Sequence, residues 1–101
     1  MTGQHVTIRA ATCADLDSLL LIEQSCYAFP WSRRHFIDEF DNPAAAIDIA
    51  LLDGQIAGYL CSWLICGELQ IQNLAIAPWC RRRGVGQKLL EYVIARCTPK
   101  G

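Results

Sequence analysis

The sequence predicts a single α/β domain, of the α+β type, over residues 1–101. One alternating apolar stretch comes first, and two stretches with helical spacing follow it. Three more apolar stretches are separated by turn residues, and a last amphipathic stretch closes the chain. The expected element order is therefore β-α-α-β-β-β-α. A hydrophobic share of 52% is ample for one packed core, and we find no internal repeat, linker or low-complexity segment.

The first part of the chain predicts a strand and two helices. Alternation over residues 5–11 indicates the strand. Thr12 and Asp15 approach a capping box, and apolar residues at helical spacing then carry the first helix to about Tyr27. Ser32 is a candidate N-cap for a second, short helix, which an Asn-Pro pair ends.

The middle of the chain predicts two antiparallel strands joined by a tight turn. From Ala46 the apolar period changes from helical to alternating. Asp53-Gly54 is a hairpin turn signal, and the apolar run over residues 55–65 supplies the second strand. Gly67 marks the next turn.

The stretch ELQIQNLAIAP, residues 68–78, predicts a fourth strand with an irregularity. Its apolar residues before and after Gln72-Asn73 lie in opposite phases of the alternation. A β-bulge at this point would bring the two halves into agreement. Because bulges free backbone groups from strand pairing and often lie beside binding sites, we expect a site here.

The next stretch, WCRRRGVGQKLL, places three arginines in front of an amphipathic helix that should bury Val85, Leu89, Leu90, Val93, Ile94 and Cys97. A helix N-terminus already carries about half a positive charge, so each further cation there costs on the order of 0.3–1 kcal/mol. An anion bound by the backbone N–H groups of the glycine-flanked turn would remove that cost. The stretch therefore predicts an anion site.

Two common phosphate-binding patterns do not fit this stretch. A Walker loop needs another glycine spacing and a hydroxyl after Lys88, and a dinucleotide fingerprint needs a glycine where Leu89 stands. The pattern that remains is R-x-x-G-x-G, formed by Arg81, Gly84 and Gly86.

With this pattern the chain resembles the GNAT superfamily of acetyl-CoA-dependent N-acetyltransferases, whose signature is Q/R-x-x-G-x-G/A between the fourth strand and the third helix. The resemblance implies a mixed, mostly antiparallel sheet flanked by helices, with acetyl-CoA as cosubstrate and no metal. It implies that Leu74, Ala75 and Ile76 pair with the pantetheine arm. The implied pyrophosphate residues are Arg81, Arg82, Arg83, Gly84, Val85, Gly86 and Gln87.

Three further stretches, FPWSRRHF, IRAATCADLDSLLLIEQ and LQIQNLAIAPWCRRRGVGQKLLEYVI, resemble the RimI-type ribosomal-protein alanine N-acetyltransferases. This resemblance implies acetyl transfer to the N-terminal α-amine of a protein, such as a ribosomal protein. It places Phe29, Pro30 and Trp31 near the acceptor. Alternatively, Phe29 and Trp31 pack the first two helices together, and both interpretations stay open.

Catalytic residues are not predicted, because RimI-type enzymes carry their base carboxylate and tyrosine acid in a fifth strand and fourth helix. This chain ends at Gly101, before those elements, so the resemblance implies C-terminal truncation. Glu68 is the nearest carboxylate that could act as a base, although a solvated turn suits it better. Cys80, beside the arginines, is a candidate for a lowered thiol pKa, yet direct transfer needs no cysteine nucleophile.

Truncation would also leave the fourth strand at an open edge. We expect Leu69, Ile71, Leu74 and Ile76 to form an exposed apolar edge and the chain to self-associate through it. Two alternatives to an enzyme stay open. One is a coenzyme A-binding remnant without catalysis. The other is a non-enzymatic module whose open edge pairs with a strand of a partner.

Charge and composition exclude other classes of function. A net charge of −1 makes the arginine cluster a local feature, so we expect no nucleic-acid partner. The apolar runs are short and the first residues lack a signal-peptide pattern, so we expect no membrane segment and a cytoplasmic location. Six cysteines without a C-x-x-C pair predict mostly small buried side chains rather than a disulfide or metal framework.

Overall fold

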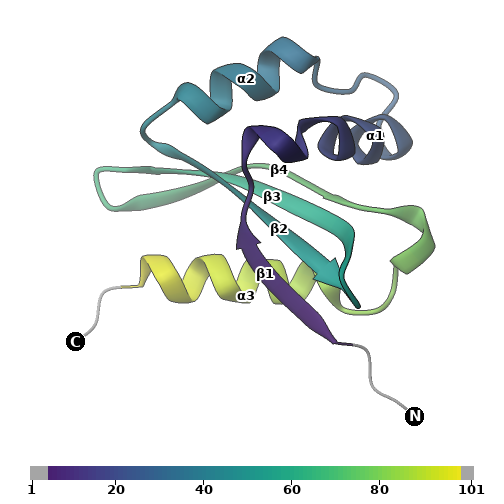
Figure 1. Ribbon diagram of the computed structural model, residues 1–101. Helices are drawn as coiled ribbons and strands as arrows, with labels where there is room; N and C mark the ends of the chain where they lie inside the picture. The colour runs from purple at the N-terminus through teal and green to yellow at the C-terminus, as the bar shows by residue number, and fades with distance from the viewer. Residues whose placement is uncertain (1–4, 99–101) are drawn as a thin grey trace.

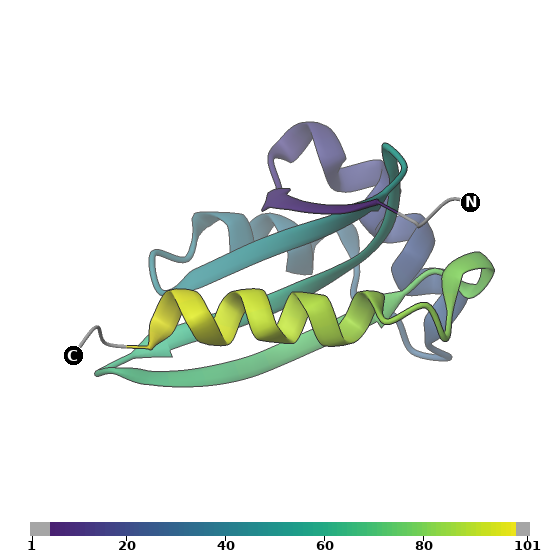
Figure 2. The same ribbon diagram turned by 90° about the horizontal axis from the view of Figure 1, so that it is seen from below.

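The computed structural model describes residues 5–98, in which a four-stranded sheet separates two layers of helix (Figure 1). Two helices cover one face, α1 (Leu16–Cys26) and α2 (Arg33–Asp41), and α3 (Val85–Cys97) lies along the other face (Figure 2). The strands are β1 (Val6–Ala10), β2 (Ala45–Leu52), β3 (Gln55–Ile65) and β4 (Glu68–Ile76).

The strands follow one another in the sheet in the order β1-β2-β3-β4, and each is antiparallel to its neighbour. Two short 3-10 turns complete the set, η1 (Cys13–Asp15) before α1 and η2 (Pro78–Cys80) after β4. The expected element order is confirmed. The expected domain ends, at residues 1 and 101, lie outside the described residues.

Both predicted helix starts are confirmed. The Thr12 N–H group donates to the Asp15 carboxylate at 2.8 Å, and the turn η1 then leads into α1. The Ser32 side chain accepts a hydrogen bond from the backbone N–H of His35 at 3.1 Å, as an N-cap does. The first helix ends at Cys26, one residue before the predicted position.

The two hairpins of the sheet turn on pairs of residues with positive φ. Asp53 and Gly54 have φ values of 52° and 85°, and Cys66 and Gly67 have values of 52° and 81°. Positive φ at both central positions is the type I′ arrangement, whose twist matches that of the flanking strands. These turns fix the register of β2, β3 and β4.

The predicted irregularity in β4 is a β-bulge. Asn73 pairs with Cys61, but Ile71 pairs with the next residue of β3, Ser62, so Gln72 is the additional residue. One additional residue reverses the alternation of side chains. The apolar residues on either side of the bulge therefore face the same side of the sheet.

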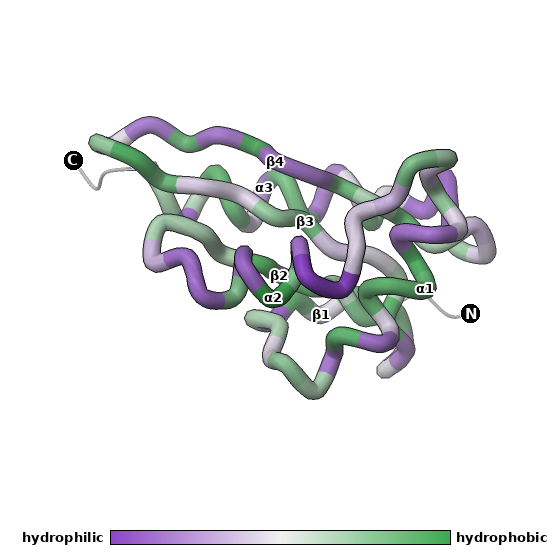
Figure 3. Tube along the Cα trace, turned by 90° about the horizontal axis from the view of Figure 1, so that it is seen from above, coloured by the Kyte–Doolittle hydropathy of each residue, from purple (hydrophilic) through white to green (hydrophobic). Residues whose placement is uncertain are grey.

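That shared side is the one covered by α3, so the apolar residues of β4 are less exposed than the sequence predicts. Leu69, Leu74 and Ile76 are partly buried against the core, and only Ile71, at 44%, is well exposed. The expectation of four exposed apolar side chains is wrong for the other three. Before the bulge, hydrophilic residues alternate with them along the strand (Figure 3).

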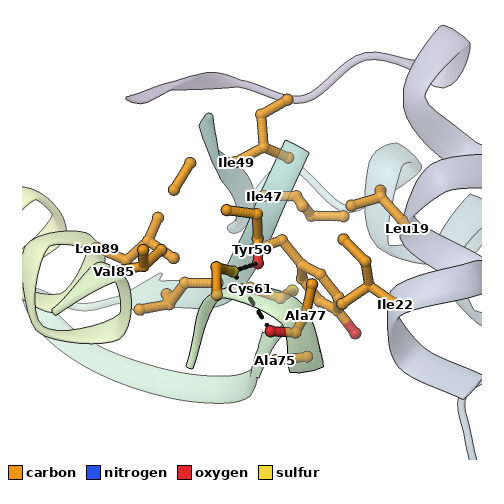
Figure 4. Close-up of a cluster of buried hydrophobic side chains, with 14 of the residues drawn as sticks. Leu19, Ile22, Ile47, Ile49, Tyr59, Cys61, Ala75, Ala77, Val85 and Leu89 are labelled. Carbon is orange, nitrogen blue, oxygen red and sulfur yellow. Dashed lines mark hydrogen bonds between the residues drawn. The ribbon is translucent and has the colours of Figure 1, made fainter. Parts of the chain in front are cut away.

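The hydrophobic core lies on both faces of the sheet. Leu19 and Ile22 project from α1 onto the face that carries Tyr59, whereas Val85 and Leu89 of α3 reach the sheet from the other side (Figure 4). Each such buried side chain stabilises the fold by about 1.5–3 kcal/mol. In α3 the predicted apolar face is confirmed except at its edge, where Ile94 is 52% exposed.

The cysteines are buried less often than the sequence predicts. All six are free thiols, but only Cys61 and Cys80 are buried, whereas Cys13 and Cys66 are exposed. The exposed pair lies in η1 and in the β3–β4 turn, where the chain meets solvent. The exposure of these two cysteines therefore depends on their position in a turn and not on their residue type.

Candidate functional site

Within residues 5–98, β4 is an edge strand that pairs only with β3. The Ala77 N–H group donates to the Ala57 carbonyl at 2.7 Å, and the same pairing repeats two residues earlier, at Ala75. In an antiparallel pair, the residues between such positions direct their backbone groups outward. Leu74 and Ile76 therefore present both N–H and C=O groups on the open side.

The C-terminal end of α1 touches this open edge. The Tyr27 hydroxyl donates to the Leu74 carbonyl, and the Cys26 thiol donates to the Ile76 carbonyl at 3.2 Å. Arg81 reaches the same carbonyl with Nε at 3.3 Å, and its Nη2 lies 3.4 Å from the Cys26 sulfur. One end of α1, the end of β4 and the start of the arginine turn thus meet at one place.

The turn before α3 exposes backbone donors. Arg82 and Gly84 have φ values of 67° and 76°, and Gly84 is the N-cap of α3 without a side-chain cap. The Lys88 N–H group donates to the Gly84 carbonyl at 3.1 Å, so the three N–H groups before it have no acceptor within the helix. The first turn of α3 carries no acidic residue. These features fit an anion held at the helix N-terminus.

The arginines add positive charge to that turn. Arg81, Arg82 and Arg83 are all exposed, and none forms an ion pair with a carboxylate of residues 5–98. The neighbouring Cys80 differs from its expectation. Its thiol is buried, with the Ala57 and Ala77 carbonyls each 3.3 Å away.

Burial raises the pKa of the Cys80 thiol, and the nearby Arg83 and Arg81 lower it by less. The expectation of a lowered pKa at Cys80 is therefore wrong. The cause is desolvation, which disfavours the thiolate more than the two guanidinium groups favour it.

A hollow of about 340 Å³ opens between the end of α1 and β4. Its wall includes Phe29 and Trp31, two of the three residues that the resemblance placed near the acceptor, but not Pro30. The complete lining is Glu23, Tyr27, Ala28, Phe29, Trp31 and Asn73. The structure thus brings the loop between α1 and α2 next to the bulged strand.

The two aromatic residues of this loop behave differently. Trp31 stacks on His35, with ring centroids 3.8 Å apart, and meets Phe36 edge to face, so it packs the loop onto α2. Phe29 is 94% exposed. The ring of Trp31 thus packs against α2, while its backbone N–H reaches Glu23 of α1, so the helix-packing interpretation holds in part for Trp31 and not for Phe29.

Sequence reasoning missed Glu23, a carboxylate that is only 1% exposed. It accepts hydrogen bonds from the Trp31 N–H and the Asn73 side-chain amide, both at 2.8 Å, and from the Tyr59 hydroxyl. Burial, and then the bond to Glu23, raises the pKa of Tyr59 far above its usual range. A signal was available, because Glu23 follows Leu16 at the seven-residue spacing of the buried helix face.

Glu68 lies away from these residues. It is exposed at the first position of β4, six residues before Leu74, which corresponds to roughly 20 Å along a strand. Among residues 5–98, no cluster of three or more histidine, cysteine or acidic side chains is arranged to hold a metal ion. No helix in the same range has the length and apolar character needed to cross a membrane.

The chain is similar to known acetyltransferases. A Bacillus subtilis protein, provisionally named as a ribosomal protein bS18-alanine N-acetyltransferase, is 32% identical over 94 residues, which are 92% of this chain and 62% of that protein. The ribosomal protein bS18-alanine N-acetyltransferase of Salmonella typhimurium is 30% identical over 95 residues, 94% of this chain and 64% of that one. The chain therefore spans about three fifths of the length of these relatives.

Solved structures agree with this likeness. The ribosomal-protein-S18-alanine N-acetyltransferase of Escherichia coli superposes with a TM-score of 0.85 at 28% identity, over 92% of this chain and 59% of that one. The PaiA N-acetyltransferase of Thermoplasma acidophilum, solved with coenzyme A, shares the fold with a TM-score of 0.80 at 15% identity, over 92% and 72%. Residues 16–101 match the acetyltransferase (GNAT) family. Since this match covers most of the sequence, the chain belongs to the GNAT family of acetyltransferases.

Proposed function

We propose that the chain is the acetyl-CoA-binding part of an N-acetyltransferase that acetylates the N-terminal α-amine of a protein. One observation carries the proposal. The outward N–H groups of Leu74 and Ile76 lie on the strand that leads directly into the uncapped N-terminus of α3, so one extended ligand with an anionic end can use both.

The proposed cofactor residues divide into two groups. Leu74 and Ile76 form the edge that pairs with the amide-bearing pantetheine arm, while Ala75 between them directs its backbone groups to Tyr59 of β3 and contributes only its place in the strand. The residues that would hold the pyrophosphate are those of the arginine turn and the first turn of α3, namely Arg81, Arg82, Arg83, Gly84, Val85, Gly86 and Gln87.

Space at the two glycines agrees with the Q/R-x-x-G-x-G/A pattern of the family. A Cβ atom added there would lie 3.6 Å from the Ile76 side chain, which is ordinary contact, so alanine would also fit. Gly84 differs, because its φ of 76° is unfavourable for other residues. The turn therefore needs glycine at its first position and only a small residue at its second.

The proposed acceptor site is the hollow beside β4, with Phe29, Pro30 and Trp31 in the loop that borders it. An amine entering this hollow would approach the β4 edge near Leu74, whose carbonyl already contacts Tyr27 of the same hollow. The outward N–H groups of the edge can donate to the thioester oxygen as negative charge develops on it. The described residues thus bind and orient both reactants.

The acceptor that we propose is an N-terminal alanine of a ribosomal protein, encountered in the cytoplasm. Support for this class comes from the relatives, six of which are named for bS18-alanine acetylation, one of them provisionally. The base and acid of the reaction are not assigned to this chain, and Glu68 is too far from the edge to serve.

Calorimetric titration of acetyl-CoA into the chain tests the proposal, with desulfo-coenzyme A as a control against thiol chemistry. Replacing Arg81 and Arg83 by alanine should weaken binding by about tenfold or more, because hydrogen bonds to charged groups contribute about 1.5–3 kcal/mol each. The fold should survive, since both side chains are exposed.

A matched control removes the same charge elsewhere. Arg33 and Arg34 lie on α2 in exposed ion pairs with Asp17 and Asp38, so their replacement by alanine should leave acetyl-CoA binding unchanged. If both double variants weakened acetyl-CoA binding equally, the effect would be a general one of charge, and the pyrophosphate assignment would be wrong. Saturable binding without turnover on an alanine-initiated peptide would instead point to a coenzyme A-binding remnant.

A further inference from the structure

Between Leu74 and Ile76, the open edge of β4 has free hydrogen-bond donors but few free acceptors. Both outward carbonyl oxygens already accept hydrogen bonds, one from Tyr27 and the other from Cys26 and Arg81. The outward N–H groups of the same two residues point to the same open side. The Ile76 carbonyl thus accepts from two groups, which is its full capacity, and the Leu74 carbonyl accepts from one. This stretch therefore offers free donors, whereas most of its acceptor capacity is used.

A neighbouring β-strand needs free acceptors on the edge as well as free donors. An added strand lies about 4.8 Å away and alternates N–H and C=O groups, so it must donate to the edge as well as accept from it. The Tyr27 hydroxyl already donates to the outward Leu74 carbonyl, so an N–H group of that strand would compete with it for this acceptor. A ligand whose carbonyl oxygens face the edge meets no such conflict.

We propose that Tyr27 and Cys26 are positioning residues that reserve the Leu74–Ile76 edge for a ligand with carbonyl oxygens and exclude a β-strand from it. The identity of that ligand, a thioester with an amide-bearing arm, rests on the proposed function. The exclusion of a β-strand does not depend on the proposed function. Any self-association through the edge of β4 is then confined to residues 68–72, before and at the bulge.

The chemistry of Tyr27 suits this role. Burial, followed by the nearby Glu23 and Cys26, raises the pKa of its hydroxyl, and Arg81 lowers it by less. A phenol with a raised pKa keeps its proton at neutral pH and remains a donor. Tyr27 is 41% exposed and lines the hollow, and its hydroxyl contacts the Leu74 carbonyl, so it stands between the proposed acceptor site and the cofactor edge.

Amide hydrogen exchange followed by NMR tests the proposal at the two N–H groups themselves. In the unchanged chain, the Leu74 and Ile76 amides should exchange with little protection at any protein concentration. In Tyr27→Phe, which frees the Leu74 carbonyl, protection without ligand should rise with concentration, at least tenfold in the millimolar range. Combining this change with Cys26→Ala should strengthen the effect.

Two controls separate positioning from general loosening of the fold. Tyr59→Phe also removes one hydroxyl, from the Glu23 cluster, without touching the edge, and should leave both amides as they were. Cys26→Ser keeps a donor toward the Ile76 carbonyl and should behave like the unchanged chain. Concentration-dependent protection in the unchanged chain, or identical exchange in Tyr27→Phe and the unchanged chain, would overturn the proposal.

The exchange data also keep this proposal separate from the proposed function. If the unchanged chain fails to bind acetyl-CoA, the function fails, but the comparison with Tyr27→Phe still decides whether a strand is excluded. If acetyl-CoA binds and protects the Leu74 and Ile76 amides, both proposals gain support. Binding that leaves both amides unprotected contradicts the carbonyl-binding part of the inference.

Discussion

Two almost completely buried carboxylates lie on opposite faces of the sheet, and each 1% exposed side chain is satisfied in a different way. Asp48 of β2 faces α3 and accepts two hydrogen bonds from one guanidinium group, that of Arg96, at 2.8 and 2.9 Å. Glu23 of α1 lies on the opposite face of the sheet, the one covered by α1 and α2. It accepts hydrogen bonds from three neutral donors in three different parts of the chain.

This difference indicates that Asp48 stabilises the fold, whereas Glu23 positions the residues around the candidate site. Asp48 has one partner, whose charge cancels its own, and this pair fixes one helix to one strand. Glu23 joins the loop at Trp31, the strand β3 at Tyr59 and the strand β4 at Asn73, and both the loop and β4 border the hollow. We therefore expect the first carboxylate to govern stability and the second to govern the geometry of the hollow.

The largest effect should come from breaking the ion pair at Arg96. Arg96→Ala leaves Asp48 buried without a counter-charge, which should cost about 3–5 kcal/mol in the free energy of unfolding. Urea denaturation measures it. Asp48→Asn should cost less, because Arg96 is 39% exposed and can be solvated. Equal costs for the two variants would contradict this account of the pair.

A smaller effect on stability but a larger one on the site should follow from Glu23→Gln. The amide keeps one acceptor oxygen and turns an NH₂ group toward existing donors, which should cost about 1–3 kcal/mol. Amide NMR shifts at Trp31 and Asn73 should change, because both lose a carboxylate partner.

Glu39 offers the matched control for this variant. It is also buried, and it accepts from the Trp63 indole at 2.6 Å, away from the hollow. Glu39→Gln should cost a similar amount of stability without moving the signal of Asn73. The Trp31 signal is less selective, because Trp31 stacks on His35, which lies 4.0 Å from Glu39. If both variants moved the Asn73 signal alike, Glu23 would have no special connection to the hollow.

The smallest effect concerns a third carboxylate, Asp15, which pairs with the half-exposed Arg9 at 2.9 Å. The hydrogen bond from Arg9 holds the pKa of Asp15 below its ordinary value of 3.8. Since the folded-state pKa is the lower one, this stabilisation is complete above about pH 4 and is lost as the pH falls through the folded-state value. Asp15→Asn should therefore flatten the acid side of the stability curve, measured by thermal unfolding between pH 2 and pH 6. An unchanged acid limb would contradict the pairing.

Much of the fold was predictable because its signals are local. The change from helical to alternating period, the turn pairs and the N-caps each lie within a few residues, and so does the phase slip that revealed the bulge at Gln72. The arginine turn was predictable for the same reason. Its exposed donors depend on the positive φ of Gly84 and Arg82, which the R-x-x-G-x-G pattern indicates only at the glycine.

The contacts that complete the candidate site were not predictable, because they join distant parts of the chain. Tyr27 meets the Leu74 carbonyl across 47 residues, and Glu23 meets Asn73 across 50. The same limit explains Cys80. Three adjacent arginines suggested a lowered thiol pKa, but burial of the thiol beside the Ala57 and Ala77 carbonyls, which sequence does not reveal, dominates.

The order of the strands in the sheet has a consequence for folding. β2, β3 and β4 are consecutive and joined by two-residue turns, so they can pair within microseconds of one another, whereas the contacts from α1 to β4 must close a loop of about 50 residues. We expect the three-stranded meander to form first. Until α1 docks, the carbonyl groups of Leu74 and Ile76 have no hydrogen-bond partner, and the partly folded sheet has an edge strand that can pair with another chain. The interval before α1 docks is therefore when the chain is most prone to aggregate.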